Sequence, residues 1–148
     1  MPAPQFSTFE SKNRSNNKPK RRYTLAEANR ALPLVTRIVR DIVNSHERAT
    51  QLQAKIEELP GAKDAAYVQG QLDLALDRLQ DYVDELTALG VELKDYETGL
   101  IDFPGRHDGR DILLCWKLGE ERVGHWHEIH AGFAGRQPAS KLREGESA

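Results

Sequence analysis

Both tryptophans, the single cysteine and four of the five histidines lie between Gly99 and Arg136, the segment whose residue types are best suited to chemistry. His125 and His127 are two residues apart, so in an extended strand both imidazoles would lie on one face. Two imidazoles placed in this way can chelate a metal ion, and Asp102 on a neighbouring strand could add a carboxylate. These donors suit zinc, manganese or iron. The spacing therefore indicates a candidate divalent-metal site at His125, His127 and Asp102.

Other residues could extend or replace this set. If the segment is helical rather than extended, His127 pairs with His130 instead. Further donors from neighbouring strands could complete the site: His107, Cys115 and Glu128. The competing interpretation is structural: Trp126 packs in the core while the histidines bond to the backbone or face solvent. The spacing matches no specific zinc signature, which favours the structural interpretation.

The same residues could also support acid/base or metal-dependent catalysis. His127 would bind the metal or carry a proton, Asp102 would bind the metal or orient the imidazole, and Glu128 would act as a general base. Arg136 would hold an anionic substrate through its guanidinium, with Arg110 nearby. Adjacent residues of a strand point to opposite faces, so His127 and Glu128 share a site only if the chain bends there.

Cys115 is the only cysteine, so no intramolecular disulfide can form. It lies in an apolar segment, where a buried cysteine usually behaves as a small hydrophobic residue, and the lack of a clear base nearby disfavours a nucleophilic role. A chain without disulfides fits the reducing cytoplasm. No apolar run approaches the roughly 20 residues that cross a bilayer. We therefore expect a cytoplasmic protein with no membrane partner.

A capping box at Thr24–Glu27 predicts the start of a long helix. Pro33 lacks a backbone N–H, so the helix either breaks there into two helices or kinks. From Leu32 to Ile56 the apolar residues keep the three- and four-residue spacing of a coiled-coil-like seam. His46 and Gln53 occupy polar seam positions, where such residues usually fix register.

A second helix carries the same spacing from Val68 to Leu89, and Gly90 supplies a left-handed cap at its end. Pro and Gly at Leu59–Asp64 predict the turn between the helices. The two seams should face each other in an antiparallel hairpin over residues 24–90. Two helices alone leave apolar edges exposed, so we expect either a homo-oligomer, with a dimer favoured, or coverage by the C-terminal unit.

The C-terminal unit, residues 91–138, is predicted to be β-rich. Leu100–Phe103 and Ile112–Trp116 have the composition of strands, and Asp108–Gly109 between them is a strong hairpin signal. A third extended piece is predicted at Arg122–Ile129. The fold class is therefore mainly α with a small β unit (α+β), a long antiparallel helical hairpin followed by a small antiparallel sheet.

The two ends are predicted to be disordered tails around a single domain, residues 23–138. Residues 1–22 are polar with a net charge of +5, whereas residues 23–148 carry −7. The acidic remainder disfavours nucleic acid as a partner, although the tail could contact phosphates. The basic residues concerned are Lys18, Lys20, Arg21 and Arg22. Residues 139–148 have the composition of a second polar tail.

Six blocks of sequence carry a family resemblance. They are Tyr23–Pro33, Val91–Asp95, Gly99–Pro104, Leu114–Glu120, Trp126–Glu128 and Ala131–Arg136. Together they resemble the uncharacterised bacterial family catalogued as domain of unknown function 2203, over about residues 23–138. The family carries no established activity, so the resemblance implies fold and boundaries rather than a reaction. It draws attention to residues inside the blocks: Lys94, Asp95, Asp102, Trp116, His127, Glu128 and Arg136. His125 and His130 stand outside them.

Three functions follow from these features. The seams favour a non-enzymatic scaffold or interaction protein that self-associates through its helical hairpin and docks an unknown protein partner. The alternative is a metal-binding protein or metal-dependent enzyme with its site at Asp102, His127 and Glu128. A second alternative is weak nucleic-acid association through the basic N-terminal tail. Approach of Asp102 to His127 within hydrogen-bonding or ligand distance would favour the metal site.

Overall fold

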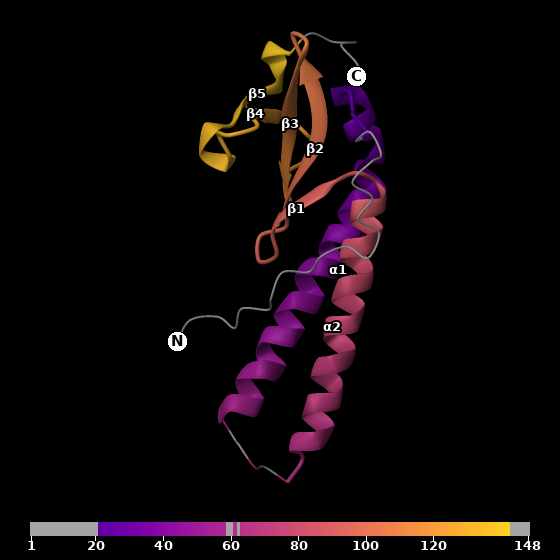
Figure 1. The fold of residues 1–148 in the computed structure, drawn as a ribbon, viewed down its shortest axis with the longest axis vertical. Helices are drawn as coiled ribbons and strands as arrows, with labels where there is room; N and C mark the ends of the chain where they lie inside the picture. Colours follow the sequence, from indigo (N-terminus) through magenta and orange to yellow (C-terminus); the bar gives the residue numbers. More distant parts are fainter. Residues whose placement is uncertain (1–20, 59–60, 62, 143–148) are drawn as a thin grey trace.

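The computed structural model describes residues 21–58, 61 and 63–142. Helices α1 (Leu25–Glu58) and α2 (Ala65–Ala88) form an antiparallel hairpin, and a small sheet packs against one end of it (Figure 1). The sheet contains β1 (Glu92–Asp95), β2 (Leu100–His107), β3 (Arg110–Lys117), β4 (His125–Glu128) and β5 (Gln137–Pro138). Two short 3-10 helices, η1 (Phe133–Gly135) and η2 (Ala139–Lys141), flank β5. The predicted α+β class is confirmed.

The capping box forms at the start of α1. The Glu27 amide donates to the Thr24 hydroxyl oxygen (3.1 Å), and the Thr24 amide donates to the Glu27 carboxylate (2.9 Å). Two amide groups that a helix start leaves without partners are thereby satisfied. One residue earlier, the Tyr23 amide donates to the Pro104 carbonyl (2.7 Å), and the Tyr23 ring packs edge-on against Phe103. The start of α1 is therefore fixed to strand β2.

Helix α1 continues through Pro33, so the break into two helices does not occur. An interior proline costs about 3 kcal/mol because it removes a hydrogen bond and crowds the preceding turn. Its neighbours Leu32 and Val35 are buried in the core, and each buried aliphatic side chain contributes about 1.5–3 kcal/mol. Burial of the flanking stripe outweighs the proline, whose own ring faces solvent.

The predicted seams form the interior of the hairpin. Ten residues that keep the seam spacing are buried in the structure: Leu32, Val35, Val39, Ile42, Ala49, Val68, Leu72, Ala75, Leu79 and Leu86. The end of α2 has the predicted left-handed cap: Gly90 has φ +80°, its amide donates to the Thr87 carbonyl, and the Val91 amide donates to the Leu86 carbonyl. His46 stacks on Tyr96 beyond β1 (ring centroids 5.1 Å apart).

All five strands pair antiparallel in sequence order. A two-residue turn, Asp108–Gly109, joins β2 and β3, and both residues have positive φ (51° and 77°), as a type I′ hairpin requires. Strands β2 and β3 are longer than predicted, and Pro104 lies within β2 rather than in a loop. The Pro104 carbonyl accepts a hydrogen bond from the Tyr23 amide, so the hydrogen-bonding edge of Pro104 points away from β3. The missing N–H of the proline therefore removes no bond to β3.

The segment around His127 is extended, which decides between the two predicted conformations in favour of a strand. Strand β4 covers four residues, fewer than the predicted Arg122–Ile129, and β1 and β5 were not predicted as strands. Ala139, assigned to the C-terminal tail, is buried, and its amide donates to the Gly124 carbonyl (2.9 Å). Residues 1–20 and 143–148 of the predicted tails, and 59, 60 and 62 of the predicted turn, lie outside the described residues.

The two faces of the sheet differ in chemistry. The face that packs on the helices contributes apolar side chains to the main core: Ile101, Phe103, Ile112, Leu114, Trp116 and Trp126. Because side chains alternate along a strand, the intervening residues lie on the opposite face, and these include Asp102, Cys115 and His127. Neither described helix has the length and apolarity to span a membrane.

Gly99, directly before β2, lies against Val39 and Val43 of α1, so a side chain at this position should disturb the packing between the sheet and the helix. A Cβ atom there would lie 2.8 Å from Val39 Cγ1 and 2.9 Å from Leu118 Cβ, and φ is +71°. We expect Gly99→Ala to lower the free energy of unfolding by about 2–4 kcal/mol, combining overpacking with left-handed backbone strain. Chemical denaturation measures it. Gly109→Ala is the control, since φ is also positive but no atom lies within 4 Å. Equal losses in both variants would contradict the packing argument.

Candidate functional site

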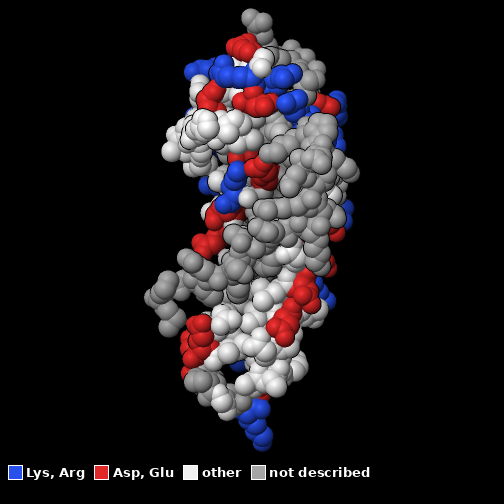
Figure 2. Space-filling model, viewed as in Figure 1, with Lys and Arg blue, Asp and Glu red and all other residues white. Residues whose placement is uncertain are grey.

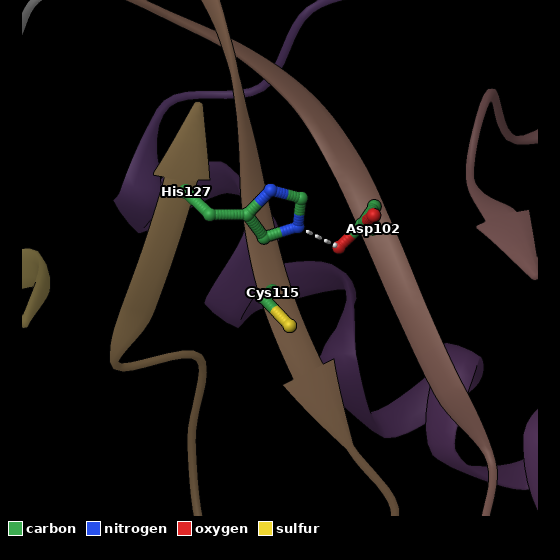
Figure 3. Close-up of side chains that lie close together, drawn as sticks. All are labelled: Asp102, Cys115 and His127. Atoms are coloured by element: carbon green, nitrogen blue, oxygen red, sulfur yellow. Dashed lines mark hydrogen bonds and ion pairs between the residues drawn. The ribbon is translucent and has the colours of Figure 1, made fainter. Parts of the chain in front are cut away.

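Three donor side chains converge on the sheet face that points away from the helices (Figure 3). Asp102 on β2 and Cys115 on β3 are directly opposite each other in the strand register, and His127 comes from β4. One ligand atom from each side chain lies within 4.8 Å of the other two. All three residues are buried, with exposed fractions of 2%, 0% and 2%. They form what we call the donor cluster.

Both ring nitrogens of His127 are hydrogen-bonded. Nδ1 lies 2.7 Å from the Glu128 carbonyl oxygen, and Nε2 lies 3.0 Å from Asp102 Oδ1. A carbonyl oxygen only accepts, so Nδ1 carries a proton. The second bond needs one more proton, which resides either on Nε2 beside an ionised carboxylate or on Asp102 beside a neutral imidazole. The two side chains therefore share one proton across this hydrogen bond.

Burial controls the ionisation of the other two donors. It raises the pKa of Asp102 above its usual value, against the opposing charge of His127. It also raises the pKa of the Cys115 thiol to about 12, with the negative charge of Asp102 adding to the effect. In the metal-free protein Cys115 is therefore a thiol, which agrees with the expectation that it is not a nucleophile.

His125 faces a separate polar cluster rather than His127. Arg136 Nη2 lies 3.1 Å from His125 Nδ1 and 2.7 and 2.8 Å from the two carboxylate oxygens of Glu120. Burial alone would raise the pKa of Glu120, but the bonds from Arg136 and the Lys117 amide outweigh it and hold that pKa below its usual value. The Arg136 guanidinium also lies 4.7 Å from the centre of the Phe133 ring. Arg136 thus connects the segment before β5 to the turn after β3, and its guanidinium pairs with the carboxylate of Glu120.

The Glu128 carboxylate is not brought to Asp102 and His127. Adjacent strand residues face opposite ways, and Glu128 pairs instead with Arg110, whose Nε lies 2.7 Å from Oε1. Only the backbone carbonyl of Glu128 takes part in the site. The ring of His107 lies 5.4 Å from that of Trp126, on the helix side of the sheet.

The basic residues at the start of the chain are only partly described. Lys18 and Lys20 lie outside the described residues. The Arg21 guanidinium lies over the Tyr23 ring (4.4 Å), and Arg22 Nε lies 2.9 Å from Asp111 Oδ1.

The sequence places Cys115 among the possible donors, but its apolar surroundings favour a role as a small hydrophobic residue. The register signal was available: a two-residue turn at Asp108–Gly109 pairs residues equidistant from it, and five steps along each strand place Asp102 opposite Cys115. The neighbouring position of His127 depends on the irregular loop between β3 and β4, which no local pattern specifies.

Substitution of Asp102 should show whether Nε2 of His127 can accept a hydrogen bond from this position. In metal-free protein we expect Asp102→Ala to lower the free energy of unfolding by about 2–4 kcal/mol, because a buried imidazole nitrogen loses its partner and a small cavity forms. Asp102→Asn should lose less, since its amide can donate to Nε2 of neutral His127. Urea unfolding measures both, with Glu128→Ala as the control, because the partly exposed Glu128 carboxylate lies outside the donor cluster. Equal losses of stability in the Ala and Asn variants would contradict the inference that Nε2 of His127 can accept a hydrogen bond.

The thiol of Cys115 should be inert in the folded, metal-free protein. At pH 8 the thiol stays protonated, because burial raises its pKa to about 12, and the side chain is closed off from solvent. We expect no measurable modification by a maleimide over an hour, and complete modification in denaturant, as read by mass spectrometry. Rapid labelling of the folded protein would show that the donor cluster is open to solvent.

Comparison with known proteins gives one match. The model of a family described as "Uncharacterized conserved protein (DUF2203)" matches residues 21–139, a range that contains both helices, all five strands and the whole donor cluster. Searches of curated proteins and of solved structures found no match. The resemblance in the six sequence blocks is thereby confirmed, and the chain belongs to the DUF2203 family.

Proposed function

We propose that this protein binds a divalent transition-metal ion through Asp102, Cys115 and His127. The observation that carries the proposal is the convergence of a carboxylate, a thiol and an imidazole within 4.8 Å, all buried, on three neighbouring strands. Buried ionisable groups are rare unless they pair or coordinate a metal. The Asp102–His127 bond pairs two of the three groups, the Cys115 thiol interacts with Asp102, and a metal ion would use all three donors.

The orientation of His127 supports metal coordination. A histidine that binds a metal through one nitrogen almost always donates its other N–H to a carbonyl, carboxylate or water, which fixes the tautomer and the ring. Here Nδ1–H donates to the Glu128 carbonyl (2.7 Å), and Nε2 points toward Asp102. The ring is therefore already held in the pose that a ligand needs.

The donor types narrow the choice among the expected ions. Thiolate is a soft ligand that favours zinc or iron, whereas manganese prefers oxygen donors. Three protein ligands leave one position of a tetrahedral ion for water or another small group. An ionised Asp102 and an ionised Cys115 would neutralise a dication, so the occupied buried site would carry no net charge.

Metal binding at this site should depend on pH. A metal must displace the proton of the Cys115 thiol and the proton shared by His127 and Asp102, so affinity should rise as pH increases. A thiolate ligand also requires that Cys115 remain reduced, which supports the expectation of a cytoplasmic location.

Elemental analysis of protein purified without a histidine tag, followed by cobalt titration, tests the proposal. We expect about one zinc or iron per chain and a thiolate-to-cobalt charge-transfer band. Cys115→Ser should abolish that band, and His127→Gln should weaken cobalt affinity by about 10-fold or more. His130→Ala is the control, because His130 is exposed and lies outside the donor cluster. A wild-type protein without bound metal and without the cobalt band would refute the proposal.

A further inference from the structure

The large apolar side chains that are exposed on the two described helices lie on one face of the hairpin. They are Leu34, Tyr67 and Leu74, with exposed fractions of 49%, 68% and 51%. Tyr67 and Leu74 are seven residues apart and share a stripe of α2, and Leu34 shares a stripe of α1 with Arg48, two heptads later. Arg48 donates to Gln71 (3.4 Å), which donates to the Tyr67 hydroxyl (2.9 Å), so the two stripes are neighbours. We call this surface the outer face.

The outer face points away from the sheet. Val43 of α1 lies beside Gly99, where a Cβ atom would be 3.2 Å from Val43 Cγ2. Asp41, one heptad after Leu34 on the same stripe, is two residues from Val43 and therefore roughly 200° around the helix from it. The sheet thus covers one side of α1, and the outer face lies on the other.

The distal half of the hairpin has a small core of its own. It consists of five buried residues supplied by the two helices: Ala49, Leu52, Val68, Leu72 and Ala75. Two of the five are alanines, so little apolar area is buried there. Figure 2 shows that the lower part of the hairpin, seen from one side, is largely uncharged between clusters of acidic groups. Further packing against this half would increase its stability.

We infer that the outer face binds a second copy of this chain, in a two-fold symmetric dimer whose hairpins run parallel and whose α1 packs on the partner's α2. This goes beyond the proposed metal binding and does not depend on it. With the two-fold axis parallel to the hairpin, each residue of α1 meets the residue of the partner's α2 at the same level. The result is a four-helix bundle, the usual way to bury apolar faces of helical hairpins.

Charge complementarity supports this arrangement. Arg37 lies 21 residues before Glu58 at the end of α1, and Glu85 lies 20 residues after Ala65 at the start of α2, so the two are at the same level. In the dimer Arg37 would meet Glu85 of the partner subunit, on the flank of the outer face. Both side chains are exposed in the single chain.

In the dimer, Asp41 would form a second ion pair with Arg78 of the partner subunit. Asp41 is 17 residues from the end of α1 and Arg78 is 13 residues from the start of α2, an offset of about 6 Å that an arginine side chain can span. Two-fold symmetry repeats both pairs. The antiparallel alternative would place α2 on α2, where five acidic residues and one arginine per helix would repel.

The available area fits a stable dimer. Helix α2 is about 36 Å long, and two adjacent helices are about 20 Å wide, so the outer face offers roughly 700 Å² per subunit. Stable complexes bury about 800 Å² per partner. The outer face is therefore large enough for a specific interface, provided that most of its length is used.

Analytical ultracentrifugation of the full chain, with charge-reversal variants, tests this interface. We expect wild-type protein to have twice the chain mass of 16.7 kDa at about 50 µM. Glu85→Arg and Arg37→Glu should each raise the dissociation constant at least about 10-fold, and the double variant should recover most of the loss. Glu47→Arg is the matched control: it is an exposed reversal of the same kind, roughly 120° around α1 from Asp41.

Two outcomes would overturn the inference. One is a monomeric wild-type protein at this concentration. The other is a dimer that the single reversals leave intact, or that the double variant weakens as much as both singles together, because then the contact lies elsewhere. Recovery by the double variant cannot arise from misfolding. The measurements are repeated in the presence of a chelator, so that loss of a metal at the donor cluster and loss of the dimer are told apart.

Discussion

The register of the β2–β3 hairpin is the constraint on which the rest of the structure depends. The positive φ angles of Asp108 and Gly109 close a two-residue turn, and this turn sets every pair along eight residues of each strand. Because side chains alternate, a slip of one residue would turn Asp102 and Cys115 into the helix-facing core and expose Phe103 and Trp116. The apolar burial on one face thereby holds the polar donors together on the other.

Contacts at the ends of the β2–β3 hairpin fix its position relative to the helices and to the remaining strands. Tyr23 joins the start of α1 to β2 through Pro104 and Phe103, and Gly99 lets the sheet approach α1. On the far edge, the bond between Arg136 and Glu120 ties the segment before β5 to the turn after β3. Strand β4 is thus held from both sides, and with it the imidazole that reaches Asp102.

Features determined by neighbours in the sequence could be predicted, whereas features determined by distant contacts could not. The Thr24 capping box and the Gly90 cap are local, and so are the helix seams, and all appear as expected. The continuity of α1 through Pro33 depends on burial against distant residues, which no local rule measures. Strands β1 and β5 are short and derive their pairing from β2 and β4, so their own sequences carry little strand signal.

The candidate site shows the same division, and its chemistry bears on the proposed metal binding. The alternative site groups Asp102, His127 and Glu128, and the structure brings the first two together, whereas strand alternation turns the Glu128 carboxylate to the opposite face. For packing alone, apolar residues of similar volume would fill this face at least as favourably as a buried acid, thiol and imidazole, since burying ionisable groups carries a desolvation penalty that pairing only offsets.

Burial leaves Cys115 with a pKa of about 12, so the thiol is not ionised near neutral pH. A bound dication changes that balance, because it stabilises the thiolate and the carboxylate together. Such a fold would lose stability to its donor cluster when empty and regain it when a metal binds.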